Sequence, residues 1–112
     1  MDYLMYCLKK EGIYVFLDMM TYRKFKEADG VANSVALKDR AAPYCMFDPT
    51  LIKLQKEYMD VLWNHYNPYT KLAYKDDPLI VMSDVANEVD LFGCFNQKIE
   101  VEPYAGNFRK MF

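Results

Sequence analysis

Two runs of hydrophobic residues stand out along the chain, and each is about as long as a β-strand. Residues 13–20 (IYVFLDMM) are almost continuously apolar, and residues 79–85 form the second run. Continuous rather than alternating hydrophobicity is typical of a parallel strand that is buried on both faces. The pattern therefore predicts two buried parallel strands.

A helix is predicted before the first run. Residues 2–11 place Leu4, Cys7 and Leu8 at helical spacing, and two lysines suit the carboxyl end of the helix dipole. Gly12 follows directly and can adopt the left-handed conformation that ends many helices.

The strongest local signal lies between the two runs. Asp48 is a favourable N-cap, and Pro49 occupies the first helical position, where a missing N–H costs nothing. We expect this helix to run to about residue 66, before Asn67-Pro68 ends it. Its apolar face is marked by five residues, namely Leu51, Leu54, Tyr58, Leu62 and Tyr66.

The remaining segments carry weaker patterns. Residues 21–47 have no clear periodicity and predict a long loop, and residues 67–78 predict a connection rich in tyrosine. Residues 93–112 form a weakly patterned tail, with the first turn of a helix expected from Asn107.

The order of elements is helix, strand, loop, helix, loop, strand, which indicates an α/β fold with a parallel sheet. Two strands alone leave both sheet edges open, and open edges pair readily with another chain. We therefore expect residues 1–112 to be a single partial domain cut from a larger sheet, and the isolated chain to form homo-oligomers.

Composition narrows the function classes. The chain has 112 residues, 53% of them hydrophobic, which is enough for one domain with a core. Its net charge of −2 disfavours nucleic acid as a partner. No apolar run reaches the roughly 20 residues of a membrane span, and the first residues do not resemble a signal peptide. We expect no membrane partner, and the localisation stays open.

Metal and redox chemistry are not expected. The chain has one histidine and three isolated cysteines, Cys7, Cys45 and Cys94, which form no zinc-binding cluster and no disulfide framework. We predict reduced thiols that mostly fill the core, and no metal or organic cofactor.

The candidate chemistry follows the two strands, because parallel α/β proteins place their sites at the carboxyl ends of strands. Asn87 and Glu88 follow the second run, and Tyr22 and Arg23 follow the first. A glutamate held at the end of a buried strand is suited to general acid catalysis. The alternative is an ordinary solvated carboxylate.

Several motifs occur in an order that resembles one enzyme family. They are Leu8–Val15, Asp48-Pro49 with the helix after it, Asn67-Pro68-Tyr69-Thr70, Tyr74–Pro78 and Asn87-Glu88. Together they resemble the cellulase-like members of clan A glycoside hydrolases, which fold as (β/α)8 TIM barrels. The resemblance covers about residues 2–92 and corresponds to the region from helix two to strand four.

The resemblance implies a retaining glycosidase acting on a β-linked polysaccharide or glycan. Glu88 would be the general acid/base, and Asn87 would bind the sugar hydroxyl beside the reacting carbon. Tyr22 and Arg23 would lie on the catalytic-face loop as substrate-binding residues. The nucleophile would come from strand seven, which this chain does not contain, so the chain by itself is expected to be catalytically incomplete.

Three positions depart from the family pattern. Lys71 stands where glycine is usual, Val89 stands where asparagine is frequent, and Asp18-Met19-Met20 replaces a run of the Asn-Leu-His type. An alternative is therefore a non-catalytic, oligomerising interaction protein, or a degenerate remnant of such an enzyme. A small enzyme with a new site is a third interpretation.

Overall fold

The computed structural model describes residues 1–19, 23–37, 44–87 and 101–111. It divides into two compact units, one of Met1–Thr21 with Glu57–Asn87 and the other of Tyr22–Lys56 with Glu88–Phe112. In chain order its elements are α1 (Asp2–Lys10), β1 (Val15–Asp18), η1 (Glu27–Asp29), α2 (Ser34–Leu37), η2 (Tyr44–Met46), α3 (Pro49–Trp63), β2 (Tyr66–Asn67), β3 (Leu72–Ala73), η3 (Tyr74–Asp76), β4 (Ile80–Asp84) and α5 (Tyr104–Arg109).

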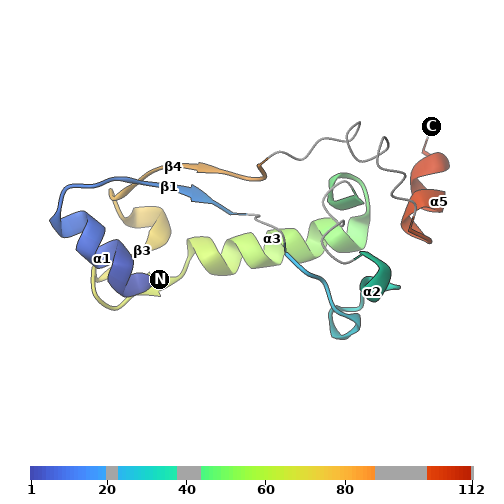
Figure 1. The fold of residues 1–112 in the computed structure, drawn as a ribbon, viewed down its shortest axis with the longest axis horizontal. Coiled ribbons are helices and arrows are strands. Elements are labelled where there is room, and N and C mark those ends of the chain that lie inside the picture. Colours follow the sequence, from blue (N-terminus) through green and yellow to red (C-terminus); the bar gives the residue numbers. More distant parts are fainter. Residues whose placement is uncertain (20–22, 38–43, 88–100, 112) are drawn as a thin grey trace. The chain divides into compact units, whose positions relative to one another are not determined.

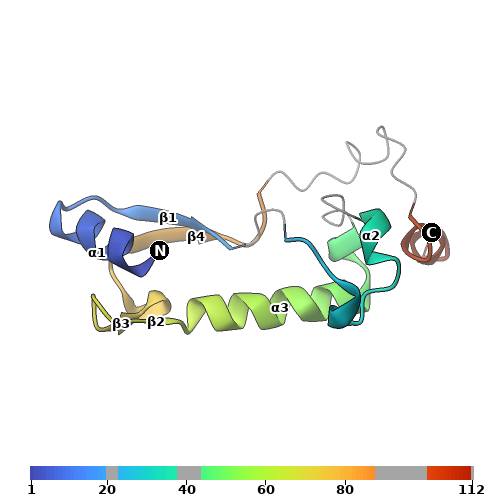
Figure 2. The same cartoon turned by 60° about the horizontal axis from the view of Figure 1, so that its bottom comes forward.

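A two-stranded parallel sheet forms the centre of the first unit. Strands β1 and β4 lie side by side and point in the same direction, as Figures 1 and 2 show. Residues 19–79 separate these strands in the sequence, so their pairing is a long-range contact. The predicted parallel pairing within a mixed α/β structure is confirmed.

The register of this sheet shifts by one residue partway along. Val15 is paired with Ile80, but the next residue, Phe16, is paired with Met82. Val81 is therefore an extra residue on β4, as in a β-bulge. Beyond the shift the strands stay in register, and Asp18 is paired with Asp84 at their carboxyl ends.

The core of this unit lies on one face of the sheet. Met5, Leu17, Tyr74 and Leu79 are buried together, and Trp63 packs against them. Burying a leucine side chain contributes about 1.5–3 kcal/mol, so these contacts hold α1 and η3 to the strands.

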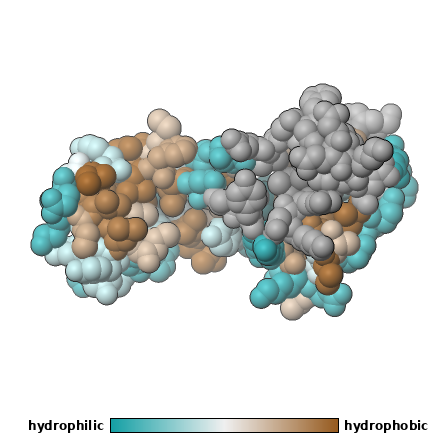
Figure 3. Space-filling view, in the orientation of Figure 1, coloured by the Kyte–Doolittle hydropathy of each residue, from teal (hydrophilic) through white to brown (hydrophobic). Residues whose placement is uncertain are grey.

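The prediction that both strands are buried on both faces is wrong for the described residues. Phe16 is 56% exposed and Met82 is 64% exposed, and other apolar residues of the two runs are also exposed, namely Ile13, Tyr14, Val81 and Val85. Figure 3 shows hydrophobic residues gathered on the surface of this unit. Leu17 points to the core while its neighbour Phe16 does not, because side chains alternate along a strand.

Helix α3 begins as predicted and ends earlier. Asp48 Oδ1 accepts hydrogen bonds from the backbone N–H groups of Thr50 and Leu51, at 3.0 and 3.1 Å, which is N-cap geometry. The helix ends at Trp63, so Tyr66 belongs to β2 and is 57% exposed instead of continuing the apolar face. A hairpin of β2 and β3 occupies the predicted connection after the helix.

The second unit has a core of its own. Its buried residues include Phe25, Val31, Leu37, Tyr44, Leu51, Val101 and Tyr104. The Tyr104 hydroxyl donates to the carbonyl of Ala32 at 2.7 Å, and the Tyr44 hydroxyl accepts from the backbone N–H of Val101 at 3.1 Å.

Two expectations for this unit are corrected. The segment predicted as a loop, residues 21–47, contains three short helices in its described part, η1, α2 and η2. The C-terminal helix begins at Tyr104 and not at Asn107. Long-range contacts of Tyr44 and Tyr104 stabilise η2 and α5, which are too short to be stable alone.

Candidate functional site

The carboxyl ends of β1 and β4 place two carboxylates on neighbouring strands. Asp18 and Asp84 are register partners, and the backbone N–H of Met19 donates to the Asp84 carbonyl at 3.2 Å. Register partners in a parallel pair point to the same face of the sheet, here the face that exposes Phe16 and Met82. Asp84 Oδ1 is buried and accepts no hydrogen bond from any described residue.

Asn87 lies three residues beyond the end of β4 and is exposed. An exposed amide in this position is accessible to a ligand that approaches the carboxyl ends of the strands. Glu88, the predicted general acid/base, lies outside the described residues, and so does Tyr22.

Arg23 belongs to the second unit, and its guanidinium is already engaged there. Its Nη1 donates to the Leu54 carbonyl at 2.6 Å, and the group lies 5.0 Å from the centre of the Phe25 ring. These contacts attach the segment after β1 to helix α3. Arg23 and Asn87 belong to different units.

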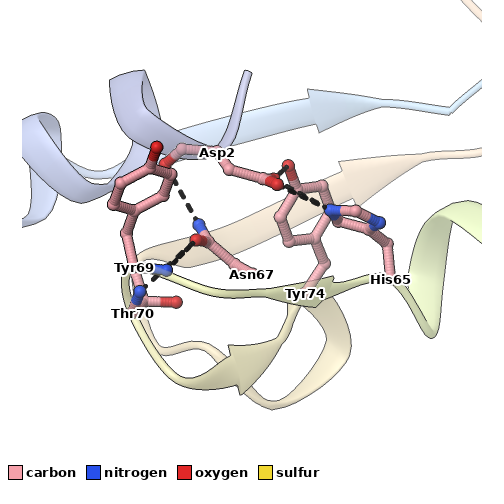
Figure 4. Close-up of polar contacts among 6 residues, drawn as sticks. All are labelled: Asp2, His65, Asn67, Tyr69, Thr70 and Tyr74. Atoms are coloured by element: carbon pink, nitrogen blue, oxygen red, sulfur yellow. Dashed lines mark hydrogen bonds and ion pairs between the residues drawn. The ribbon is translucent and has the colours of Figure 1, made fainter.

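A second polar cluster, which the sequence did not reveal, is built around Asp2 on elements that precede β1 and β4 (Figure 4). The Tyr74 hydroxyl donates to Asp2 Oδ1 at 2.6 Å, and His65 Nε2 lies 2.9 Å from both carboxylate oxygens. The hydrogen bond from Tyr74, reinforced by His65, holds the pKa of Asp2 below its usual value. Burial, together with the neighbouring carboxylate, raises the pKa of Tyr74.

The same cluster includes Asn67, whose side chain is fully buried. Its Nδ2 donates to the backbone carbonyl of Asp2 at 3.1 Å, and its Oδ1 accepts from the N–H groups of Tyr69 and Thr70 at 2.9 and 3.3 Å. Asn67 thus forms an Asx turn and fastens the β2–β3 turn to the first residues of α1, as Figure 4 shows.

A pocket of about 280 Å³ opens beside this cluster. Its apolar walls are Met1 and side chains from the last turns of α3, and its polar groups are Asp2, His65 and Tyr74. His65 Nε2 lies 2.9 Å from the Asp2 carboxylate, which also accepts from the Tyr74 hydroxyl. The hydrogen bonds of this cluster attach the first turn of α1 to the segment that follows α3.

No local sequence signal could have revealed the Asp2–His65 contact, because the two residues lie 63 positions apart. The turn signal of Asn67-Pro68 was visible, but it indicated only a helix end. The partner of the asparagine side chain depends on where α1 packs, which only the tertiary structure shows.

Among the described residues there is no group of three or more histidine, cysteine, aspartate or glutamate side chains placed to hold a metal ion. In the same part of the chain, no helix combines the length and hydrophobicity needed to cross a membrane. Comparison of the chain with protein-family models, with curated proteins and with solved structures finds no match.

Proposed function

We propose that this chain is part of a clan A glycoside hydrolase with a (β/α)8 barrel, and that Glu88 is its general acid/base. The observation that carries the proposal is the parallel β1–β4 pair, whose carboxyl ends are aligned by the pairing of Asp18 with Asp84. Barrel enzymes draw their catalytic residues from this end of their strands. Asn87 and Glu88 come three and four residues after the end of β4, and the resemblance places such a pair at the end of barrel strand four.

The substrate would be a β-linked polysaccharide or glycan, and no metal or cofactor takes part. Glu88 would protonate the leaving glycosidic oxygen and then deprotonate the water that hydrolyses the glycosyl-enzyme. Asn87 would hydrogen-bond the hydroxyl beside the reacting carbon, which its exposed position after β4 allows. A retaining mechanism also needs a nucleophilic carboxylate about 5 Å from the acid/base, and the resemblance assigns this group to a later strand.

The test uses the complete reading frame that contains this chain. We expect it to encode further β/α units with a carboxylate at the end of a later strand. In that protein Glu88→Ala should slow hydrolysis of natural glycans by roughly 10²–10⁴-fold, the usual contribution of positioned proton transfer. Cleavage of an aryl glycoside with a good leaving group should suffer far less, and azide should restore turnover, since it attacks the intermediate without a general base.

Glu11→Ala is the matched control, because Glu11 is an exposed glutamate that follows α1. Equal losses on both substrates, with no azide rescue, would show that Glu88 is not the acid/base. The present chain by itself should hydrolyse aryl β-glycosides no faster than its Glu88→Gln variant, because the nucleophile is missing.

A second candidate function is favoured by the exposed apolar sheet face. Phe16 and Met82 are register partners, and both are more than half exposed. A non-catalytic chain could cover this face by associating with copies of itself. Sedimentation velocity tests this: Phe16→Asp should dissociate the oligomer, whereas Val35→Lys, at a site 73% exposed on α2, should not. A monomeric wild-type chain would exclude self-association.

A further inference from the structure

Three tyrosines from two separate elements form a cluster on the surface of the first unit. Tyr3 and Tyr6 lie on α1, and Tyr69 lies in the turn between β2 and β3. The Tyr3 and Tyr69 ring centres are 5.3 Å apart, and Tyr6 lies 6.1 Å from each. These separations are typical of aromatic side chains in direct contact.

Two of the three rings remain open to a ligand. Tyr3 is 61% exposed and Tyr69 is 50% exposed. Their planes meet at 66°, so together they form a corner, which we call the Tyr3–Tyr69 corner. Tyr6 is partly buried and supports both rings, and Lys10 Nζ lies 5.3 Å from the Tyr6 ring centre.

The corner is fixed in shape before any ligand arrives. Asn67 fastens the Tyr69 turn to α1 through its hydrogen bonds to the Tyr69 N–H and the Asp2 carbonyl. Figure 4 shows Asn67 between these two partners, with the Tyr69 ring beside the start of α1. A preformed site loses little conformational entropy on binding, which favours affinity.

We propose that the Tyr3–Tyr69 corner binds a β-linked glycan chain at a place distinct from the catalytic end of the strands. The C–H face of a β-linked sugar can stack on one ring while the second ring flanks it. The tyrosine hydroxyls and the Lys10 ammonium would hydrogen-bond sugar hydroxyls. The choice of a β-linked glycan rests on the proposed function, whereas the geometry of the corner does not.

The size of the corner favours a glycan over a protein partner. A whole aromatic side chain contributes about 150–250 Å² of surface, so two half-exposed rings offer about 200 Å². A stable protein interface needs about 800 Å² on each partner. A few sugar rings can be covered by a surface of this size.

The place of the corner also separates it from the proposed chemistry. Its residues lie on elements that precede β1 and β4, whereas Asn87 and Glu88 follow β4. A ligand held at the corner would therefore bind without being cleaved. The corner would hold a long chain to the enzyme while another stretch is hydrolysed.

Affinity electrophoresis of the full chain in native gels with soluble hydroxyethyl cellulose tests the proposal, with α-linked dextran as the control polymer. The glucan should retard wild type and the Glu88→Gln variant equally. Tyr69→Ala and Tyr3→Ala should each weaken binding by roughly three- to tenfold, the value of one aromatic stacking contact. Tyr69→Trp should preserve or increase it.

Tyr14→Ala and Tyr66→Ala are matched controls, since these tyrosines are 69% and 57% exposed outside the cluster. The proposal is overturned by absence of glucan binding in wild type, by equal retardation in dextran, or by equal losses in the control variants. Binding that persists in both Tyr3→Ala and Tyr69→Ala would also overturn it. Failure of the Glu88 kinetics with intact glucan binding would count against the proposed function alone.

Discussion

His65 Nε2 lies 2.9 Å from both carboxylate oxygens of Asp2, and the two residues are 63 positions apart in the sequence. Tyr74 donates to the same carboxylate from a third element. The first turn of α1 is thus attached to the segment after α3 by charge-assisted hydrogen bonds, which are about twice as strong as neutral ones.

The first prediction concerns acid. Because the pKa of Asp2 is lowered in the folded state, its contribution to stability is complete above the usual aspartate pKa of 3.8 and is lost as the pH falls further. Asp2→Asn should reduce the free energy of unfolding by about 1–2 kcal/mol at pH 7 and weaken its acid dependence. Urea titrations between pH 2 and pH 7 measure both.

Asp76→Asn is the control for this variant, because Asp76 is an exposed aspartate in η3. The free energy of unfolding of Asp2→Asn should still depend partly on acidic pH, because Asp77 also has a lowered pKa. Burial raises the pKa of Asp77, but hydrogen bonds from Lys9 and the Leu79 N–H hold it below its usual value. If Asp2→Asn and Asp76→Asn behave alike, the Asp2 contacts do not stabilise the fold.

The second prediction concerns alkali. The pKa of Tyr74 is raised in the folded state, so the unfolded chain loses this proton first. Stability should therefore fall as the pH rises above the usual tyrosine pKa of 10.0. Tyr74→Phe should cost about 1 kcal/mol at neutral pH and make the alkaline loss shallower. Thermal melts from pH 8 to pH 11 check this, with exposed Tyr66→Phe as the control.

The third prediction concerns the turn between β2 and β3. Lys71 has a φ of +62°, and its N–H donates to the Asn67 carbonyl at 2.9 Å. A residue with a Cβ is strained in this conformation by roughly 1–2 kcal/mol, and glycine is not. Lys71→Gly should therefore raise the free energy of unfolding by about 1 kcal/mol, measured in urea. Lys71→Ala keeps the Cβ and should leave the free energy of unfolding unchanged. If Lys71→Ala raised it as much as Lys71→Gly, the lysine charge rather than the backbone strain would be the cause.

The fourth prediction concerns thiol reactivity. Burial, with a smaller contribution from the charge of Asp48, raises the pKa of Cys45 to about 12. The thiolate is the reactive form, so Cys45 should react with a disulfide reagent at pH 8 at least about 100-fold more slowly than partly exposed Cys7. The measurement uses Cys94→Ser chains, each with one of the other two cysteines replaced. Unfolding the chain in urea exposes both thiols and should abolish the difference between their reaction rates.

Local signals predicted the parts of the fold that depend on neighbouring residues. Asp48 caps α3 through the N–H groups that follow it, and Gly12 has a φ of +69° after α1. The pairing of β1 with β4 was also predictable, because two apolar runs of strand length in one α/β chain have few other partners. The left-handed turn at Lys71 matches the position where the resembling family carries glycine.

Properties that depend on distant contacts could not be predicted. Tyr66 continued the helical pattern after Trp63, yet it pairs with Ala73 in a hairpin. The exposure of Phe16 and Met82 depends on what packs against the sheet, and hydrophobicity alone does not specify that. The hydrogen bond from Arg23 to a backbone carbonyl on α3 also joins distant residues. The roles of Tyr22, Arg23, Asn87 and Glu88 stay predictions.

The register shift at the extra residue Val81 determines to which face of the sheet each later side chain of β4 points. If the same sequence paired with no register shift, Ser83 rather than Asp84 would stand opposite Asp18, and each later side chain would turn to the other face. Deleting Val81 should therefore give regular pairing with Asp84 still opposite Asp18, whereas deleting a residue after Met82 would reverse the direction of the side chains leading to Asn87. Evolution should therefore accept many side chains at position 81, which is 60% exposed, but should conserve the spacing between Met82 and Asn87.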